Sequence, residues 1–120
     1  MITTNKNLNE AVYKLADKPL NDGYQLEAIH EYTDQIGQAL YWRIRLKHST
    51  TGVKWIRPVH LNVNNYCLGE PKYLEEKPLY RLHEIISRSD ETLMVCEGEW
   101  CADNLAKLGI LATTTGSSSS

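Results

Sequence analysis

The feature that most constrains the fold is an apolar run that ends in an acid and a glycine. The run Leu93-Met94-Val95-Cys96 leads into Glu97-Gly98-Glu99, and a helix-period pattern of apolar residues starts directly afterwards. An apolar run without alternation is typical of a strand buried on both faces, as in a parallel sheet. The pattern therefore predicts a buried strand that contains Cys96, a sharp turn at Gly98 and then a helix. Glu97 would stand at the carboxyl end of the strand, where open α/β sheets bind ligands.

An acid in this position has two interpretations. In the first it is functional: its oxygens hold a hard cation, or its carboxylate exchanges protons with a substrate. In the second it is structural: a carboxylate near a helix N-terminus that only interacts favourably with the helix dipole. The residues by themselves leave both interpretations open for Glu97. Glu99 and Asp103 are secondary candidates: they are four apart and share a helix face, but the simpler expectation is that both are solvated.

The segment also resembles a known family. Its residues Cys96-Glu97-Gly98-Glu99, Cys101-Ala102-Asp103-Asn104-Leu105, Leu108-Gly109 and Ala112-Thr113-Thr114 are similar to the opening Toprim motif of the Toprim-like primases of phages, plasmids and integrated elements. The preceding Pro78-Leu79-Tyr80-Arg81-Leu82-His83-Glu84-Ile85 is similar to a second signature of that family, with His83 where proline is usual. The resemblance extends over about residues 25–115.

The resemblance implies a parent protein that is a DNA primase with Mg²⁺-dependent nucleotidyl transfer. Glu97 would be the catalytic general base or metal-linked acid, and an Asp-x-Asp pair on a later strand would be the main Mg²⁺ anchor. This sequence contains no Asp-x-Asp, so the metal site would be incomplete. We expect the isolated chain to be inactive and to bind Mg²⁺ no more tightly than the millimolar range, because Mg²⁺ gives up its waters reluctantly. The implied partners are DNA and a helicase domain or replication protein.

The charge of the chain is unevenly distributed. The net charge is −2, but the segment from Gln35 to Gly69 contains no Asp or Glu. Such segregation suggests a basic surface that contacts the phosphates of DNA or RNA, single-stranded or duplex, with little sequence preference. The alternative is a hairpin whose charges are simply solvated. The candidate nucleic-acid-binding residues are Arg43, Arg45, Lys47, Lys54 and Arg57.

Composition limits the class of protein. With 120 residues, 42% hydrophobic and 23% charged, the chain fits a soluble globular protein of at most one domain. No run approaches about 18 consecutive apolar residues and no signal peptide is recognisable, so we expect a cytoplasmic protein without a membrane partner. The odd number of cysteines and the absence of Cys-x-x-Cys spacing argue against a metal cluster and against a disulfide framework.

The order of patterns predicts a mixed fold of the α+β or α/β class. An N-terminal helix and turn (residues 1–23) precede an antiparallel β region of about three strands (24–77). In that region Pro58 favours an edge position or the exit from a strand. A helix and the start of a Toprim-like β-α-β unit follow (78–115), and a serine-rich tail (116–120) is expected to be flexible.

A second function from another class fits the same residues. The chain can be a non-catalytic nucleic-acid-binding or protein-binding module of phage or plasmid origin. The two functions differ in what they require, since only the primase needs Glu97 and an Asp-x-Asp beyond it.

Overall fold

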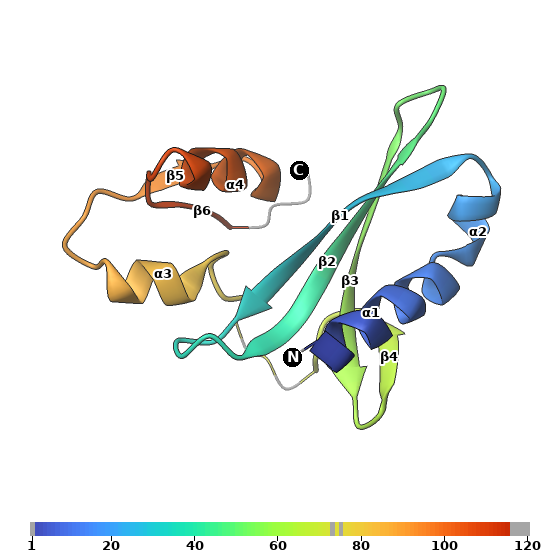
Figure 1. The fold of residues 1–120 in the computed structure, drawn as a ribbon, viewed down its shortest axis with the longest axis horizontal. Coiled ribbons are helices and arrows are strands. Elements are labelled where there is room, and N and C mark those ends of the chain that lie inside the picture. The colour runs from blue at the N-terminus through green and yellow to red at the C-terminus, as the bar shows by residue number, and fades with distance from the viewer. Residues whose placement is uncertain (1, 73, 75, 116–120) are drawn as a thin grey trace. The chain divides into compact units, whose positions relative to one another are not determined.

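The computed structural model describes residues 2–72, 74 and 76–115, with side chains from residue 7 onward. The predicted serine-rich tail, residues 116–120, lies outside the described residues. Along the chain, two helices precede a run of four strands, and a helix and a β-α-β unit follow (Figure 1). The elements are α1 (Ile2–Leu15), α2 (Asp17–Asn21), β1 (Tyr24–Thr33), β2 (Ala39–His48), β3 (Lys54–Asn62), β4 (Asn65–Leu68), α3 (Leu82–Ser87), β5 (Met94–Cys96), α4 (Glu99–Lys107) and β6 (Ala112–Thr114).

The chain divides into two compact units that are not consecutive segments. The sheet unit comprises Met1–His30 and Tyr41–Lys72, and the α/β unit comprises Glu31–Leu40 and Tyr73–Ser120. The tip of the β1–β2 hairpin therefore belongs to the α/β unit. Sequence patterns follow the order of elements along the chain, so they predicted consecutive segments. They did not indicate that the hairpin tip groups with the later part of the chain.

The sheet unit is built on a four-stranded antiparallel sheet in the order β1-β2-β3-β4. The predicted hairpins are confirmed: β2 pairs antiparallel with β3, and Trp42 lies opposite Val59. The β1–β2 turn is closed by the Asp34 carboxylate, which accepts hydrogen bonds from the N–H groups of Ile36 (3.0 Å) and Gln38 (2.9 Å). Side-chain bonds of this kind are what make Asp a frequent turn residue.

The sheet contains one strand more than the sequence predicted. β3 continues through Pro58 instead of leaving the sheet, and it pairs with β4 on its other side. The Pro58 carbonyl accepts the Gly69 N–H (2.8 Å). The N–H and C=O of one strand residue point to the same side. The Pro58 nitrogen, which has no hydrogen to donate, therefore faces the end of β4, and no hydrogen bond to β2 is lost. The edge position predicted for Pro58 is therefore wrong.

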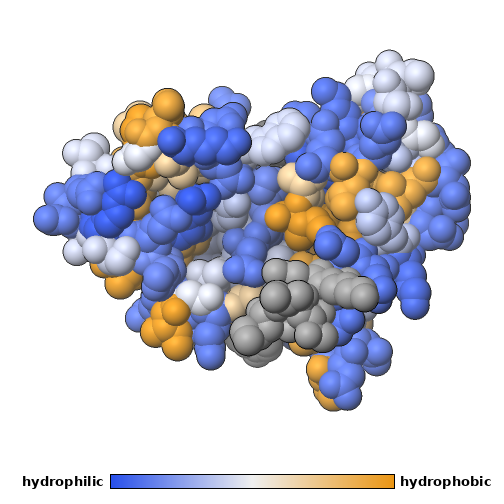
Figure 2. All heavy atoms as spheres, viewed as in Figure 1, coloured by the Kyte–Doolittle hydropathy of each residue, from blue (hydrophilic) through white to orange (hydrophobic). Residues whose placement is uncertain are grey.

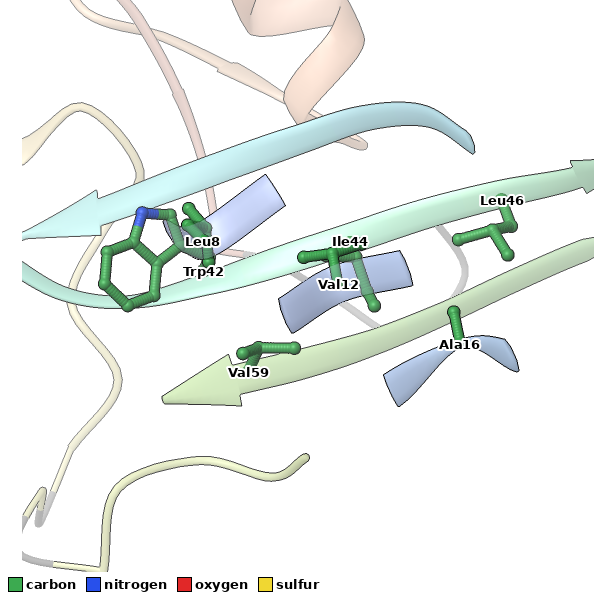
Figure 3. Packing of buried hydrophobic residues seen from close by; sticks show 7 residues of the cluster. All are labelled: Leu8, Val12, Ala16, Trp42, Ile44, Leu46 and Val59. Atoms are coloured by element: carbon green, nitrogen blue, oxygen red, sulfur yellow. The ribbon is translucent and has the colours of Figure 1, made fainter. Parts of the chain in front are cut away.

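The core of the sheet unit lies between α1 and one face of the sheet. As predicted from their spacing, Leu8 and Val12 are buried on one side of α1, and alternate β2 residues meet them (Figure 3). Each fully buried aliphatic side chain of this kind contributes about 1.5–3 kcal/mol to the free energy of unfolding. The cluster consists of Leu8, Val12, Ala16, Trp42, Ile44, Leu46 and Val59.

The α/β unit contains the predicted β-α-β arrangement. β5 and β6 are parallel neighbours, with Met94 opposite Ala112 and Cys96 opposite Thr114, and α4 connects them. The fold is therefore mixed α and β, with a four-stranded antiparallel sheet and a separate two-stranded parallel sheet.

The burial of the two parallel strands differs from the prediction. Met94 and Val95 are 48% and 66% exposed, and Cys96 is half-buried, so the expectation of a doubly buried β5 with a buried Cys96 is wrong. The fully buried strand is β6, where Thr113 and Thr114 have no exposed surface. The apolar composition of β5 predicted that the strand is buried. A sheet of only two strands, however, leaves much of β5 uncovered.

The face shown in Figure 2 is mainly polar. On this face, hydrophobic side chains form separate patches among hydrophilic ones (Figure 2). Within the described residues, no helix combines the length and apolar character needed to span a membrane.

Candidate functional site

The predicted site residue Glu97 lies in the two-residue connection between β5 and α4. β5 ends at Cys96, Gly98 is the N-cap residue of α4, and the Glu97 side chain is exposed. The chain bends at Glu97 and Gly98, as predicted, but Gly98 is extended, with φ −150° and ψ 174°, a conformation that any residue adopts. Glu97 thus stands at the carboxyl end of a parallel strand with its carboxylate open to solvent, a position from which it can meet a ligand.

Glu99 occupies a different environment, although it is only two residues further on. Its side chain is 2% exposed, and the Tyr32 hydroxyl donates a hydrogen bond of 2.5 Å to Glu99 Oε2. Glu99 is also the first residue of α4, where a carboxylate is stabilised by the helix dipole. The expectation that Glu99 is solvated is therefore wrong, and its contacts give it a structural role.

Asp103, one turn further along α4, is half-buried and bound to the segment that precedes α3. Arg81 Nη1 donates to Asp103 Oδ1 (2.6 Å), and the Tyr80 hydroxyl donates to the same oxygen (2.9 Å). Arg81 Nη2 also donates to Glu84 Oε2 (2.7 Å). The expectation of a solvated Asp103 is likewise wrong, because its carboxylate joins α4 to the start of α3.

Tyr80 fixes the same segment to β6. Its N–H donates to the Thr114 carbonyl (3.2 Å), and its own carbonyl accepts the Thr113 hydroxyl (2.6 Å). Burial, followed by the charge of Asp103, raises the pKa of the Tyr80 hydroxyl well above its ordinary value. The centres of the Tyr80 and Tyr32 rings are 5.1 Å apart, so the ring whose hydroxyl donates to Asp103 packs against the ring whose hydroxyl donates to Glu99.

The two sequence signatures therefore meet in one hydrogen-bonded network. Tyr80, Arg81 and Glu84 come from the earlier signature and are linked to Asp103 of the later one. Glu99, also from the later signature, is hydrogen-bonded to Tyr32 instead. Neither composition nor periodicity indicated this network. The available signal was the presence of both signatures in one chain, which could have suggested that their polar residues contact one another.

The described residues do not fit a Mg²⁺ ion by themselves. Across residues 7–72, 74 and 76–115, no three His, Cys, Asp or Glu side chains are grouped so that they could hold a metal. Glu97 can offer two oxygens, whereas Mg²⁺ requires octahedral coordination. No step through a metal can therefore be assigned to these residues alone.

The basic residues predicted to bind nucleic acid are divided between the two faces of the sheet. Arg57 lies opposite Ile44 in the β2–β3 register, and directly opposite residues share a face. Arg57 is thus on the core face, and its guanidinium carbon lies 4.9 Å from the centre of the Trp55 ring. The opposite face carries the other four: Arg43, Arg45, Lys47 and Lys54.

Only part of this opposite face is open. Arg45 is 8% exposed and its Nε lies 3.1 Å from Glu27 Oε1, so the expectation of an exposed basic face is wrong at this residue. Arg43 is half-buried, whereas Lys47 and Lys54 are exposed and lie directly opposite each other. A role in nucleic-acid binding stays a prediction for all five basic residues.

A groove of about 500 Å³ in the sheet unit was not predicted. It lies between α1 and the β3–β4 hairpin, and burial raises the pKa of the Tyr66 hydroxyl on its wall. Its lining mixes amide, charged and aliphatic groups, which suits no single ligand class. The residues are Asn7, Glu10, Ala11, Lys14, Leu15, Leu61, Val63, Asn64, Asn65 and Tyr66.

Comparisons with protein-family models, with curated proteins and with solved structures found no match to this chain.

Proposed function

We propose that this chain is part of a mobile-element DNA primase of the Toprim-like kind, in which Glu97 is one carboxylate of the nucleotidyl-transfer site. The observation that supports the proposal best is the β5-α4-β6 unit, with the exposed Glu97 at the carboxyl end of β5. A carboxylate in that position is open to a substrate or an ion, as a general base or a metal ligand must be.

The distinction between Glu97 and its neighbours supports the same assignment. Glu99 and Asp103 are engaged by Tyr32, Tyr80 and Arg81, so these carboxylates hold the unit together. Glu97, in contrast, is exposed on the connection between β5 and α4. On this proposal, the acid that meets the substrate is separate from the acids that stabilise the fold.

Glu97 alone gives a site without a metal anchor, so we propose that the isolated chain is inactive. The parent activity would require the Asp-x-Asp that this sequence lacks. The simplest test is the coding sequence beyond codon 120. An open reading frame that encodes a strand with Asp-x-Asp supports the proposal, and a stop codon at that point argues against it.

A non-catalytic nucleic-acid-binding module is the second candidate. It is supported by Lys47 and Lys54, which are exposed and directly opposite each other on neighbouring strands. Two like charges placed face to face repel each other, and a phosphate bound between them would relieve that repulsion. This function requires neither Glu97 nor a metal.

A further inference from the structure

A histidine ring joins the β2–β3 loop to the turn that precedes β1. His48, the last residue of β2, is half-buried, and its Nε2 lies 2.9 Å from the Asp22 carbonyl oxygen. The ring also meets the Tyr24 ring edge to face, with the ring centres 5.0 Å apart. A Cβ atom on Gly23 would lie 2.9 Å from His48 Nε2, so the histidine occupies the space that this glycine leaves open.

The other ring nitrogen closes the loop itself. The backbone N–H groups of Thr50 and Thr51 both donate to His48 Nδ1, each at 3.2 Å. Because a backbone N–H can only donate, Nδ1 must offer a lone pair, and the ring hydrogen must be on Nε2. Nε2 therefore donates to the Asp22 carbonyl. These contacts require a neutral ring with its hydrogen on Nε2.

We propose that His48 is a pH-sensitive switch, in which a proton on Nδ1 opens the tip of the β2–β3 loop (residues 49–53). A protonated Nδ1 has no lone pair, so the N–H groups of Thr50 and Thr51 lose their common acceptor. The Thr50 hydroxyl, 3.1 Å from Nδ1, can turn to accept the new hydrogen, but the two backbone N–H groups cannot. The bond to Asp22 survives protonation, because Nε2 keeps its hydrogen.

The bonds at the two ends of the loop do not involve the ring. The Ser49 N–H donates to the Gly23 carbonyl (2.9 Å), and the His48 N–H donates to the Val53 carbonyl (2.8 Å). Protonation therefore acts on the loop tip and leaves the β2–β3 ladder and the contact with the preceding turn in place.

The neighbours of the ring leave the titration to His48. The turn before β1 contributes Asp22, β1 contributes Tyr24, and the base of the loop contributes Lys47 and Lys54, which lie directly opposite each other. Of these residue types, only histidine ordinarily changes its charge between about pH 5 and pH 8. This inference depends neither on the primase proposal nor on nucleic-acid binding.

The test is NMR spectroscopy of the full chain between about pH 8 and about pH 5, where histidine changes charge. Long-range correlation spectra of the imidazole show which ring nitrogen carries the hydrogen, and we expect Nε2–H for His48 near pH 8. As His48 takes up its proton, the Thr50 and Thr51 amides should exchange with water about threefold to tenfold faster, relative to the intrinsic rate at each pH. The Ser49 amide is the internal control and should keep its rate.

His48→Asn is the matched variant, because the asparagine Oδ1 can accept the same two N–H groups and does not titrate. In this variant, exchange of the Thr50 and Thr51 amides should follow the intrinsic rate across the whole pH range. The proposal is overturned if the wild-type ring carries its hydrogen on Nδ1 near pH 8. It is also overturned if the two amides keep their protection after His48 is protonated, or if His48→Asn shows the same pH dependence as the wild type.

Discussion

Two glutamates only two residues apart lie in opposite environments in this chain. Glu97 is exposed beside the N-cap of α4, whereas Glu99 is buried under Tyr32. The difference arises because Glu99 begins α4 and faces the rest of the α/β unit, while Glu97 lies before the helix. Sequence identifies both as acids, but only the packing of α4 separates the acid that can meet a ligand from the acid that stabilises the fold.

The Tyr32–Glu99 hydrogen bond gives a direct test of the structural acid. Tyr32→Phe removes a donor from a buried carboxylate, so we expect the free energy of unfolding to fall by about 1.5–3 kcal/mol. Tyr13→Phe, at a tyrosine that is 54% exposed, should change it by less than about 0.5 kcal/mol. Urea denaturation measures both, and equal stabilities for the two variants would show that Glu99 does not depend on Tyr32.

Val63 is a residue in an unfavourable backbone conformation. Its φ is +58° at the tip of the β3–β4 hairpin, where a β-branched side chain is strained, and the side chain is 85% exposed. Asn tolerates this region, so Val63→Asn should raise the free energy of unfolding by about 1 kcal/mol. Val53→Asn, at another exposed valine, is the control and should bring no gain. A Val63→Asn variant no more stable than the wild type in thermal unfolding would argue against the strained turn.

The two parallel strands differ in burial in a way that composition did not predict. Val95 lies opposite Thr113 in the register, yet the valine is exposed and the threonine is buried. The Thr113 hydroxyl is satisfied by the Tyr80 carbonyl at 2.6 Å. A polar strand can therefore be the inner one when a neighbouring segment supplies its hydrogen bonds.

A reciprocal pair of substitutions tests this arrangement. Thr113→Val keeps the side-chain shape but leaves the buried Tyr80 carbonyl without that donor, so we expect a loss of about 1–3 kcal/mol. Val95→Thr makes the opposite change on the exposed partner and should alter stability by less than about 0.5 kcal/mol. Calorimetry of both variants would contradict the burial of β6 if Val95→Thr were the more damaging change.

The elements with clear periodicity could be predicted, and those that depend on distant partners could not. β1, β2 and the β5-α4-β6 order follow from alternation, turn residues and a helical pattern. β4 was missed because its short asparagine-flanked run has no period and is stabilised by pairing with β3. The position of Glu97 at the end of β5 could be predicted because it ends an apolar run. The contacts of Glu99 and Asp103 could not, because they join residues far apart in the chain.

For the whole molecule, charge is segregated along the chain. All fifteen acids lie outside Gln35–Gly69, a segment that carries five of the thirteen Lys and Arg residues. Such a pattern allows a local attraction to phosphates on a chain whose net charge is −2. Because Arg45 is paired with Glu27, the residues that carry this prediction are the exposed Lys47 and Lys54.

The second candidate function predicts weak, salt-dependent binding of single-stranded and duplex DNA. Lys47→Glu with Lys54→Glu should abolish this binding and leave the fold intact, because both side chains are exposed. Lys14→Glu with Lys107→Glu makes the same change in net charge at exposed helical positions and should retain most of the binding. Fluorescence anisotropy at low and moderate salt measures these affinities. Equal binding by both double variants would remove the specific support for this function.

We propose that Glu97 is the functional carboxylate of a primase. The most direct measurement is Mg²⁺-dependent nucleotide incorporation on a single-stranded DNA template by the product of the complete gene. We predict activity in the wild type, a loss of about 100-fold or more in Glu97→Gln, and unchanged activity in Glu76→Gln, an exposed glutamate of the same unit. No incorporation by the wild type, or full activity in Glu97→Gln, would contradict the claim.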